Sequence, residues 1–168
     1  MAISIVRFGT PRGPGEGPRL GTVRRPPRGV RKEDWGRRDY YDVWLPDLAP
    51  SAPLVSWISS EPVTSERWSQ FARRYRSEMR APAALRLIAV LATLSQSADF
   101  AVGCYCVDAA RCHRSLLRTL LEAAGAAVLP EAADAAGATG PTSGGSTTAA
   151  RKSLPPAGTR RPPRRRAR

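Results

Sequence analysis

The chain contains few cysteine, histidine and acidic residues, and each shortage excludes a class of protein. Its three cysteines lie close together in the sequence, so they do not form the spread framework of a disulfide-rich secreted domain. No apolar run approaches the roughly 18 residues of a membrane-spanning helix. The first residues lack the apolar segment of a signal peptide. We therefore expect a cytoplasmic protein with reduced thiols and no membrane partner.

Basic residues outnumber acidic ones. The 168 residues include 27 Lys and Arg but only 14 Asp and Glu, which gives a net charge of +13. Such an excess favours an anionic partner, such as a nucleotide or a nucleic acid. The apolar share of 42% is nevertheless sufficient for a packed core, so we do not expect the whole chain to be disordered.

The composition changes near residue 130. Beyond it the chain has no aromatic residue, a single leucine, and long stretches of Ala, Gly, Ser, Thr and Pro. Such a segment cannot bury enough apolar surface to offset the entropy lost on ordering it. We therefore predict one domain over residues 1–129 and a disordered basic tail over residues 130–168. The part before residue 131 is also basic, with 19 basic and 12 acidic residues.

Hydrophobic patterns divide residues 1–129 into strands and helices. The predicted strands are 3–8, 19–24 and 100–106, and the predicted helices are 39–45, 51–58, 65–79, 82–94 and 115–124. Helices between buried strands indicate a compact three-layer α/β sandwich with a mostly parallel sheet. The helix at 82–94 is apolar on most sides, so we expect it to be buried. Four residues of helix 65–79 form a stripe that we interpret as core: Trp68, Phe71, Tyr75 and Met79.

The segment from Cys104 to Arg114 is rich in the residue types that catalytic and ligand-binding sites use, namely cysteine, histidine, aspartate and arginine. It follows a predicted strand and leads into a predicted helix, and parallel α/β folds bind ligands at the carboxyl ends of their strands. Free amide groups and the helix dipole at a helix N-terminus favour an anion or a thiolate. We therefore predict that the pKa of Cys112 is lowered, that Cys112 acts with His113, and that Arg114 stabilises negative charge.

Three interpretations of this segment stay open. The first, to which we commit, is an anion or phosphate site with Cys112 as the nucleophile. The second is a zinc site, because three cysteines and one histidine are suitable ligands. Against it, the C-x-C-x5-C-H spacing is uncommon and Cys112 and His113 diverge, so we expect no metal and no cofactor. The third is that the cysteines are small buried hydrophobic residues.

A second basic segment, residues 24–32, follows the predicted strand 19–24. Its prolines restrict the loop, and its arginines offer planar pairs of donors to phosphate or carboxylate. Alone, such a segment is more typical of a solvated basic loop. If both strands are parallel, however, this loop and the cysteine segment lie at one edge of the sheet. We therefore predict that Arg24 and Arg28 bind the anion together with Arg114.

Four motifs follow one another along residues 24–114. They are Arg24-x-x-Pro27-Arg28-Gly29-x-x-Lys32-Glu33, Trp44-Leu45 with Leu48-Ala49-Pro50-Ser51, Trp68-x-x-Phe71-x-x-Arg74-Tyr75-x-x-Glu78, and Cys104 with Cys112-His113-Arg114. In this order they resemble the YeaO-like family, also called domain of unknown function 488, in the branch with the Cys-His-Arg motif. The resemblance covers about residues 3–125 and implies a compact α/β domain. The family has no established activity, so the resemblance implies no reaction.

One departure from that family bears on catalysis. Many members have an acidic residue at the position of Cys106, and if that acid is a general base, Asp108 is the nearest replacement. The candidate catalytic residues are therefore Cys112, His113 and Asp108. The sequence leaves open whether the protein is an enzyme acting on a nucleotide or nucleic acid. One alternative to an anion-binding domain is a non-enzymatic nucleic-acid module, whose basic tail and basic face bind phosphates without reading the base sequence. The other is a zinc or redox thiol protein.

Overall fold

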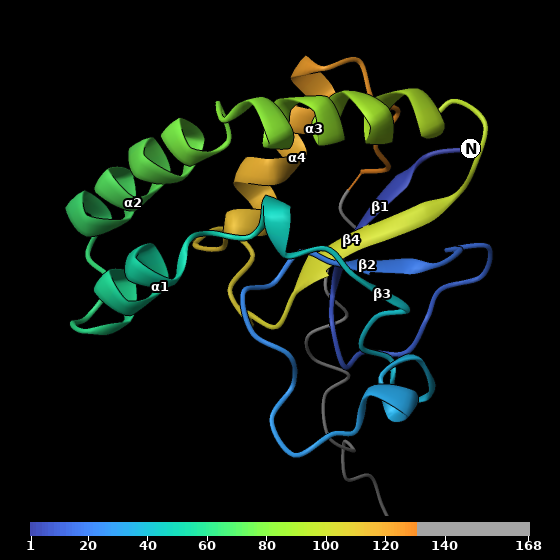
Figure 1. Cartoon of the computed structure of the whole chain (residues 1–168), viewed down its shortest axis with the longest axis horizontal. Coiled ribbons are helices and arrows are strands. Elements are labelled where there is room, and N and C mark those ends of the chain that lie inside the picture. The colour runs from blue at the N-terminus through green and yellow to red at the C-terminus, as the bar shows by residue number, and fades with distance from the viewer. Residues whose placement is uncertain (131–168) are drawn as a thin grey trace, which may run out of the picture. The chain divides into compact units, whose positions relative to one another are not determined.

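The structure, a computed structural model, describes residues 1–130, and these contain a parallel sheet of four strands with helices packed on it (Figure 1). The strands are β1 (Ile3–Arg7), β2 (Arg19–Gly21), β3 (Val43–Trp44) and β4 (Phe100–Cys104), in the spatial order β1-β4-β2-β3. All pairings between these strands are parallel. The predicted α/β class with a parallel sheet is confirmed, whereas the predicted tail lies outside the described residues, apart from Pro130.

Four α-helices correspond to four of the predicted segments. They are α1 (Ala52–Ser59), α2 (Ser65–Glu78), α3 (Pro82–Leu94) and α4 (His113–Ala123). The α4 helix begins at His113 rather than at residue 115, because Cys112 takes the cap position and its Sγ accepts a hydrogen bond from the Arg114 amide. Gly125, with a φ of 86°, follows the end of α4 as predicted. No helix of residues 1–130 is long and apolar enough to cross a bilayer.

The predicted helix at 39–45 is wrong. Two 3-10 turns, η1 (Lys32–Asp34) and η2 (Gly36–Arg38), lead to Asp39, whose φ of 58° stops further helix. The chain is then extended, because the Asp42 amide donates to the Arg19 carbonyl at 2.9 Å and the Leu45 amide to the Gly21 carbonyl at 3.0 Å. These hydrogen bonds add β3 to the edge of the sheet, and a third 3-10 turn, η3 (Pro46–Leu48), follows it.

Buried side chains form two apolar clusters. Alternation along β1 sends Ile3 and Ile5 to a first cluster, which includes residues of all four α-helices. It sends Val6 and Phe8 to a second cluster, made largely of aromatic side chains from the loops. Two of the three cysteines are buried in this second cluster, so the segment that carries the candidate chemistry is part of a packed core.

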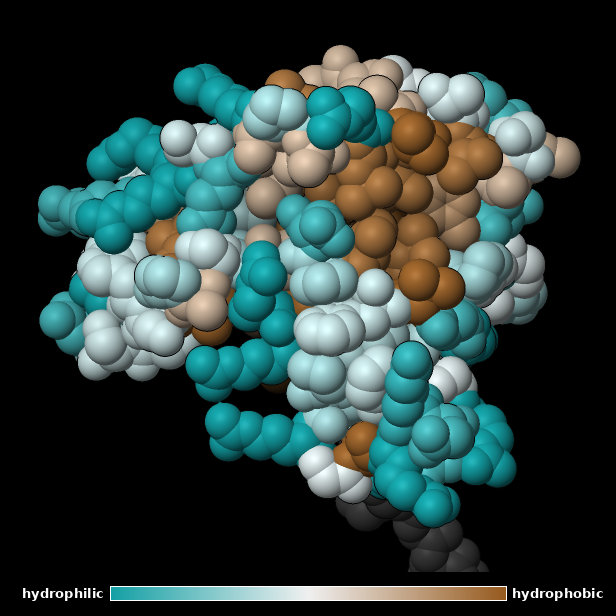
Figure 2. All heavy atoms as spheres, viewed as in Figure 1, coloured by the Kyte–Doolittle hydropathy of each residue, from teal (hydrophilic) through white to brown (hydrophobic). Residues whose placement is uncertain are grey.

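The α3 helix is buried on one side only, in contrast to the expectation from its composition. Ala84, Ile88 and Leu91 are buried, whereas Leu85 and Val90 are each 51% exposed. Figure 2 shows a hydrophobic patch on the face where α3 lies in Figure 1. The helix remains half-exposed because no element among the described residues packs over its outer side.

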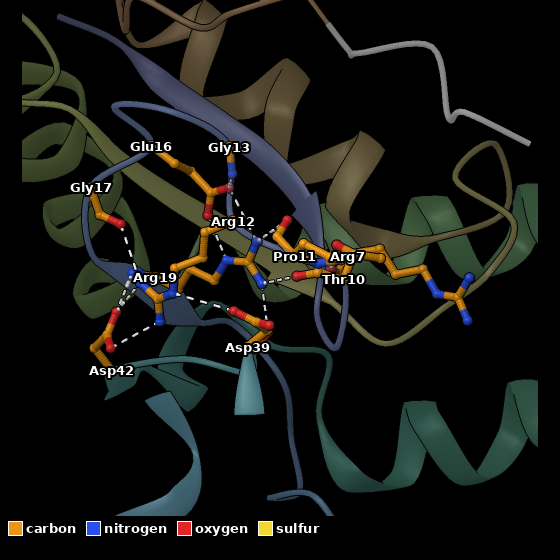
Figure 3. A network of polar contacts seen from close by, with 10 residues as sticks. All are labelled: Arg7, Thr10, Pro11, Arg12, Gly13, Glu16, Gly17, Arg19, Asp39 and Asp42. Carbon is orange, nitrogen blue, oxygen red and sulfur yellow. Dashed lines mark hydrogen bonds and ion pairs between the residues drawn. The ribbon is translucent and has the colours of Figure 1, made fainter. Parts of the chain in front are cut away.

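Arginine–carboxylate pairs fix the glycine- and proline-rich segment before β2 (Figure 3). The Arg19 side chain is fully buried and donates to the Glu16 carboxylate and to the Asp39 carbonyl oxygen. Arg12 binds both carboxylate oxygens of Asp42, at 2.9 and 3.0 Å. The network ties the segment before β2 to the segment before β3, and so holds in place the strand that leads into the basic loop.

Candidate functional site

A pocket lies where β2 and β4 end and α4 begins. Its volume is about 220 Å³, and we call it the Cys–Arg pocket. It is lined by Val23, Arg24, Arg25, Pro50, Val55, Ile58, Ser59, Trp68, Phe71, Cys104, Cys106, Arg111, Cys112 and His113. Three of these residues are arginines and none is acidic. Two larger hollows, of about 530 and 360 Å³, have neither cysteine nor histidine in their walls, so they lack the reactive groups that converge here.

The apolar wall of the Cys–Arg pocket comes from α1 and α2. Trp68 is half-buried and stacks on Phe71, with ring centroids 5.2 Å apart. Phe71, Tyr75 and Met79 are buried, as the stripe on α2 predicted. The stripe is therefore core over most of its length, but Trp68 and Phe71 also line the pocket.

All three cysteines of the chain meet at this pocket. Cys104 ends β4, Cys106 lies in the turn that follows, and Cys112 caps α4. Their sulfur atoms lie within 4.8 Å of one another, and those of Cys104 and Cys106 are 3.5 Å apart. Cys104 and Cys112 are buried and Cys106 is exposed, and none forms a disulfide. The cluster arises because the turn after β4 returns the chain to the end of the same strand.

The expectation that Cys112 has a lowered pKa is wrong. Hydrogen bonds from Cys104 and Cys112 lower the pKa of the Cys106 thiol, with help from the positive charge of Arg114. The same contacts act in the opposite direction on Cys112, whose pKa they raise together with burial. The hydrogen bond to Cys106 likewise raises the pKa of Cys104 to about 11. Negative charge in the cluster is thus centred on the exposed sulfur.

His113 is held in one orientation. Its Nε2 atom donates to the carbonyl oxygen of Thr22 at 2.7 Å, and its Nδ1 atom lies 4.0 Å from the Cys112 sulfur. The edge of the ring meets Tyr75, with centroids 5.8 Å apart. Burial lowers the pKa of His113, so the ring is neutral with its proton on Nε2. The unprotonated Nδ1 therefore faces the cysteine cluster.

Arg24 lines the pocket but binds the protein backbone. Its Nε donates to the Pro50 carbonyl at 2.8 Å, and its Nη2 donates to the carbonyls of Pro46 and Ala49 at 3.0 Å. The guanidinium thus braces the turn that carries Pro50 into the pocket wall. That Arg24 also binds an anion stays a prediction.

Two further motif residues hold the same turn from α2. The Tyr75 hydroxyl donates to the Leu48 carbonyl at 2.8 Å, and the Glu78 carboxylate accepts from the Ser51 amide at 2.9 Å. The second and third sequence motifs therefore meet in space. What they share is a scaffold that sets the position of α1, and with it one wall of the pocket.

The other predicted site residues lie around the pocket and do not line it. Arg28 is exposed in the basic loop. Asp108 is exposed, and its carboxylate accepts from the amides of Ala110 and Arg111 within its own turn. Arg114 is buried, and its Nη1 donates to the Cys106 carbonyl at 2.5 Å, which braces the turn after β4. The chemical roles predicted for these residues stay predictions.

Among the lining residues that were not predicted for the anion site are Cys104, Cys106, Arg25 and Arg111. The sequence does place the two cysteines on one side of the strand end, before Cys112, but they were considered only as candidate zinc ligands. Arg25 and Arg111 carry no comparable signal, since basic residues are abundant throughout the chain. Their place depends on how the loops fold over the pocket.

The chain is similar to uncharacterised mycobacterial proteins. One relative from Mycobacterium bovis and two from Mycobacterium tuberculosis are each 38% identical over 72 residues, which is 43% of this chain. The match spans 55% of each relative's length. No solved structure matches the chain. Residues 3–125 match the family DUF488-N3a, which is described as the active DUF488-N3 subclade. Because that match covers most of the chain, this protein belongs to the DUF488-N3a family.

Proposed function

We propose that this protein binds a small anionic substrate in the Cys–Arg pocket and that the cysteine cluster is the reactive part of the site. The observation that carries the proposal is the lining itself. Arg24, Arg25 and Arg111 border the pocket together with the cysteines and His113, and none of the lining residues within residues 1–130 is acidic. A phosphate or carboxylate group is the complement of such a surface.

Arg25 and Arg111 are the residues best suited to hold the anion. Both are exposed, so their guanidinium groups reach solvent at the pocket. Arg111 is oriented by one hydrogen bond, from its Nη1 to the Val63 carbonyl at 2.8 Å, which leaves its other donors for a ligand. Arg24 contributes positive charge to the pocket but not its Nε and Nη2 donors, since these bind backbone carbonyl groups.

The size of the pocket favours a small substrate. Sites for drug-sized ligands have volumes of about 300–1,000 Å³, whereas this pocket has about 220 Å³. Its apolar wall, which includes Ile58, Trp68 and Phe71, suits a short hydrocarbon or aromatic body attached to the anionic group. We therefore favour a small phosphate ester or carboxylic acid over a segment of nucleic acid.

Two observations support chemistry in addition to binding. The ligand would lie against an exposed cysteine, Cys106, and beside a histidine with a fixed orientation, which are common components of catalytic sites. The site lies at the carboxyl ends of parallel strands, where α/β enzymes bind their substrates.

Calorimetric titration of the full chain with phenyl phosphate and with inorganic phosphate tests the proposal. We expect binding that weakens about tenfold or more in Arg25→Ala and in Arg111→Ala, because a hydrogen bond to a charged group contributes about 1.5–3 kcal/mol. Arg28→Ala is the matched control, because it removes the same charge from the same loop outside the pocket. The proposal expects it to bind as the wild type does, whereas weaker binding would make Arg28 the anion ligand that the sequence predicts. Equal affinities of wild type, Arg25→Ala and Arg111→Ala would contradict the proposal.

A further inference from the structure

The convergence of the cysteines is unusual because it includes every cysteine of the chain. The 168 residues contain three, and all three sulfur atoms lie within 4.8 Å of one another. They come from the end of β4, from the turn after it and from the cap of α4. Small buried hydrophobic residues would not require this arrangement, since Cys106 is exposed.

We propose that Cys104, Cys106 and Cys112 bind one zinc ion through their sulfur atoms, with the fourth coordination position open to the Cys–Arg pocket. Zinc–sulfur bonds of about 2.3 Å in a tetrahedron place the sulfur atoms about 3.8 Å apart. The sulfur–sulfur distances in the structure lie on both sides of this value: the Cys104 and Cys106 sulfurs are 3.5 Å apart, and no two of the three sulfurs are more than 4.8 Å apart. Binding requires only that thiol protons leave to solvent.

The surroundings hold two of the ligands in place. The Arg114 amide donates to the Cys112 sulfur, and the Arg114 guanidinium donates to the Cys106 carbonyl. One buried residue therefore positions two of the three sulfurs, which is the role of the groups that surround metal ligands in proteins. Arg114 also supplies a positive charge beside a site that carries excess negative charge when three thiolates bind a divalent ion.

The ligand set selects the metal. Thiolates prefer zinc, copper(I) and iron–sulfur clusters over harder cations. Cubane and two-iron clusters bind four cysteines, and this chain has three. Zinc accepts three protein ligands and one exchangeable ligand when its site is catalytic. These requirements together point to zinc.

The fourth coordination position is open to the pocket because His113 is not close enough to all three sulfurs to occupy it. Its Nε2 is held by the Thr22 carbonyl. Its Nδ1 lies 4.0 Å from the Cys112 sulfur, but it does not belong to the group of ligand atoms that all lie within 4.8 Å of one another, which contains the three sulfurs alone. Cys106 and Cys112 both line the pocket, so a water molecule or an anionic group there reaches the metal. This part of the inference rests on the proposed function, whereas the zinc site itself does not.

The first experiment is elemental analysis of the purified full chain. We expect about one zinc per chain, lost in Cys106→Ser and Cys112→Ser. Cys106 is exposed, so Cys106→Ser is the variant that keeps its fold, which circular dichroism verifies. Ser59→Ala also changes a lining residue but removes no ligand, and should retain the metal. Absence of zinc from the wild type, or copper in its place, or full zinc in Cys106→Ser, would overturn the proposal.

The second experiment tests separately whether the cysteines hold the metal and whether its fourth coordination position is open to the pocket. In the cobalt-substituted full chain we expect strong visible bands of a tetrahedral thiolate site, which change when phenyl phosphate is added. Zinc lost from His113→Gln would overturn the open position by identifying His113 as the fourth ligand. Arg25→Ala should keep its zinc while it loses affinity for phosphate. Failure of the metal proposal is thus distinguishable from failure of the proposed function.

Discussion

His113 and Thr22 are joined by a hydrogen bond of 2.7 Å, although 91 positions separate them in the sequence. Thr22 follows β2 and His113 begins α4, so this bond connects the two loops that form the Cys–Arg pocket. The carbonyl can only accept, so Nε2 carries the proton. The bond also fixes the ring against Tyr75, whose hydroxyl holds the turn below the pocket.

Replacing His113 by leucine should lower the free energy of unfolding by about 1–3 kcal/mol. The Thr22 carbonyl would remain buried without a donor, and that is the cost of an unsatisfied polar group. His113→Gln retains a donor and should lose less. Urea denaturation of the two variants and the wild type measures the difference. Equal stability of His113→Leu and the wild type would show that the bond contributes nothing.

Arg24 and Arg25 are neighbours in the sequence, but they should contribute very unequally to stability. Arg24→Ala removes the donors to three carbonyls and should lower the free energy of unfolding by about 1.5–3 kcal/mol. Arg25 is exposed, and Arg25→Ala should change stability by less than about 0.5 kcal/mol. If Arg24→Ala leaves stability unchanged and abolishes phosphate binding, Arg24 is the anion ligand that the sequence predicted.

The Glu16–Arg19 pair should make stability depend on pH in the acid range. Burial alone would raise the pKa of the Glu16 carboxyl, but hydrogen bonds from Arg19 and from the Gly13 amide outweigh it and lower the pKa. Stability from this group is therefore complete above its ordinary pKa of 4.5 and is lost as the pH falls through the lower folded value.

Glu16→Ala isolates this contribution. It leaves the buried guanidinium of Arg19 without its carboxylate, which should cost about 3–5 kcal/mol at neutral pH. The difference from the wild type should shrink below pH 4.5 as Glu16 is protonated. Urea denaturation across the acid range measures it. A difference that is constant with pH would contradict the assignment.

Trp68 and Phe71 stack on each other, yet only Phe71 is core. Phe71→Ala should cost about 3–5 kcal/mol, the range for a buried aromatic residue. Trp68→Ala should cost less than half of that, because Trp68 is half-buried, and it should weaken binding of phenyl phosphate more than binding of inorganic phosphate. Equal destabilisation by both substitutions would show that Trp68 contributes to the core as much as Phe71 does, and would contradict this prediction.

Periodicity and capping signals were sufficient for the four α-helices and for the parallel sheet. They failed at residues 39–45, because two long-range hydrogen bonds to β2 decide that segment and local sequence does not contain them. They also failed for the outer side of α3, since an apolar helix is buried only where another element covers it. The predicted nucleic-acid contacts of the basic tail stay predictions.

The sequence predicted which two segments meet at the edge of the sheet, whereas the roles of the candidate site residues stay predictions. The loop after β2 and the segment before α4 do meet, as the parallel sheet required. Lowering of the Cys112 pKa followed from the helix N-terminus alone, and the proximity of Cys104 and Cys106 outweighs that effect. The argument against a metal rested on the uncommon spacing and on the divergence of Cys112 and His113, whereas the three sulfurs lie close together without His113. Distances between sulfurs depend on a turn that sequence spacing does not specify.

X-ray absorption at the zinc edge of the purified full chain is the most direct measurement of the central claim, which is that the cysteine cluster holds a metal open to an anion pocket. We expect three sulfur neighbours at about 2.3 Å and one lighter neighbour at about 2.0 Å, with the lighter neighbour altered when phenyl phosphate is added. A zinc ion with fewer than three sulfur neighbours, or a protein without zinc, would contradict the account.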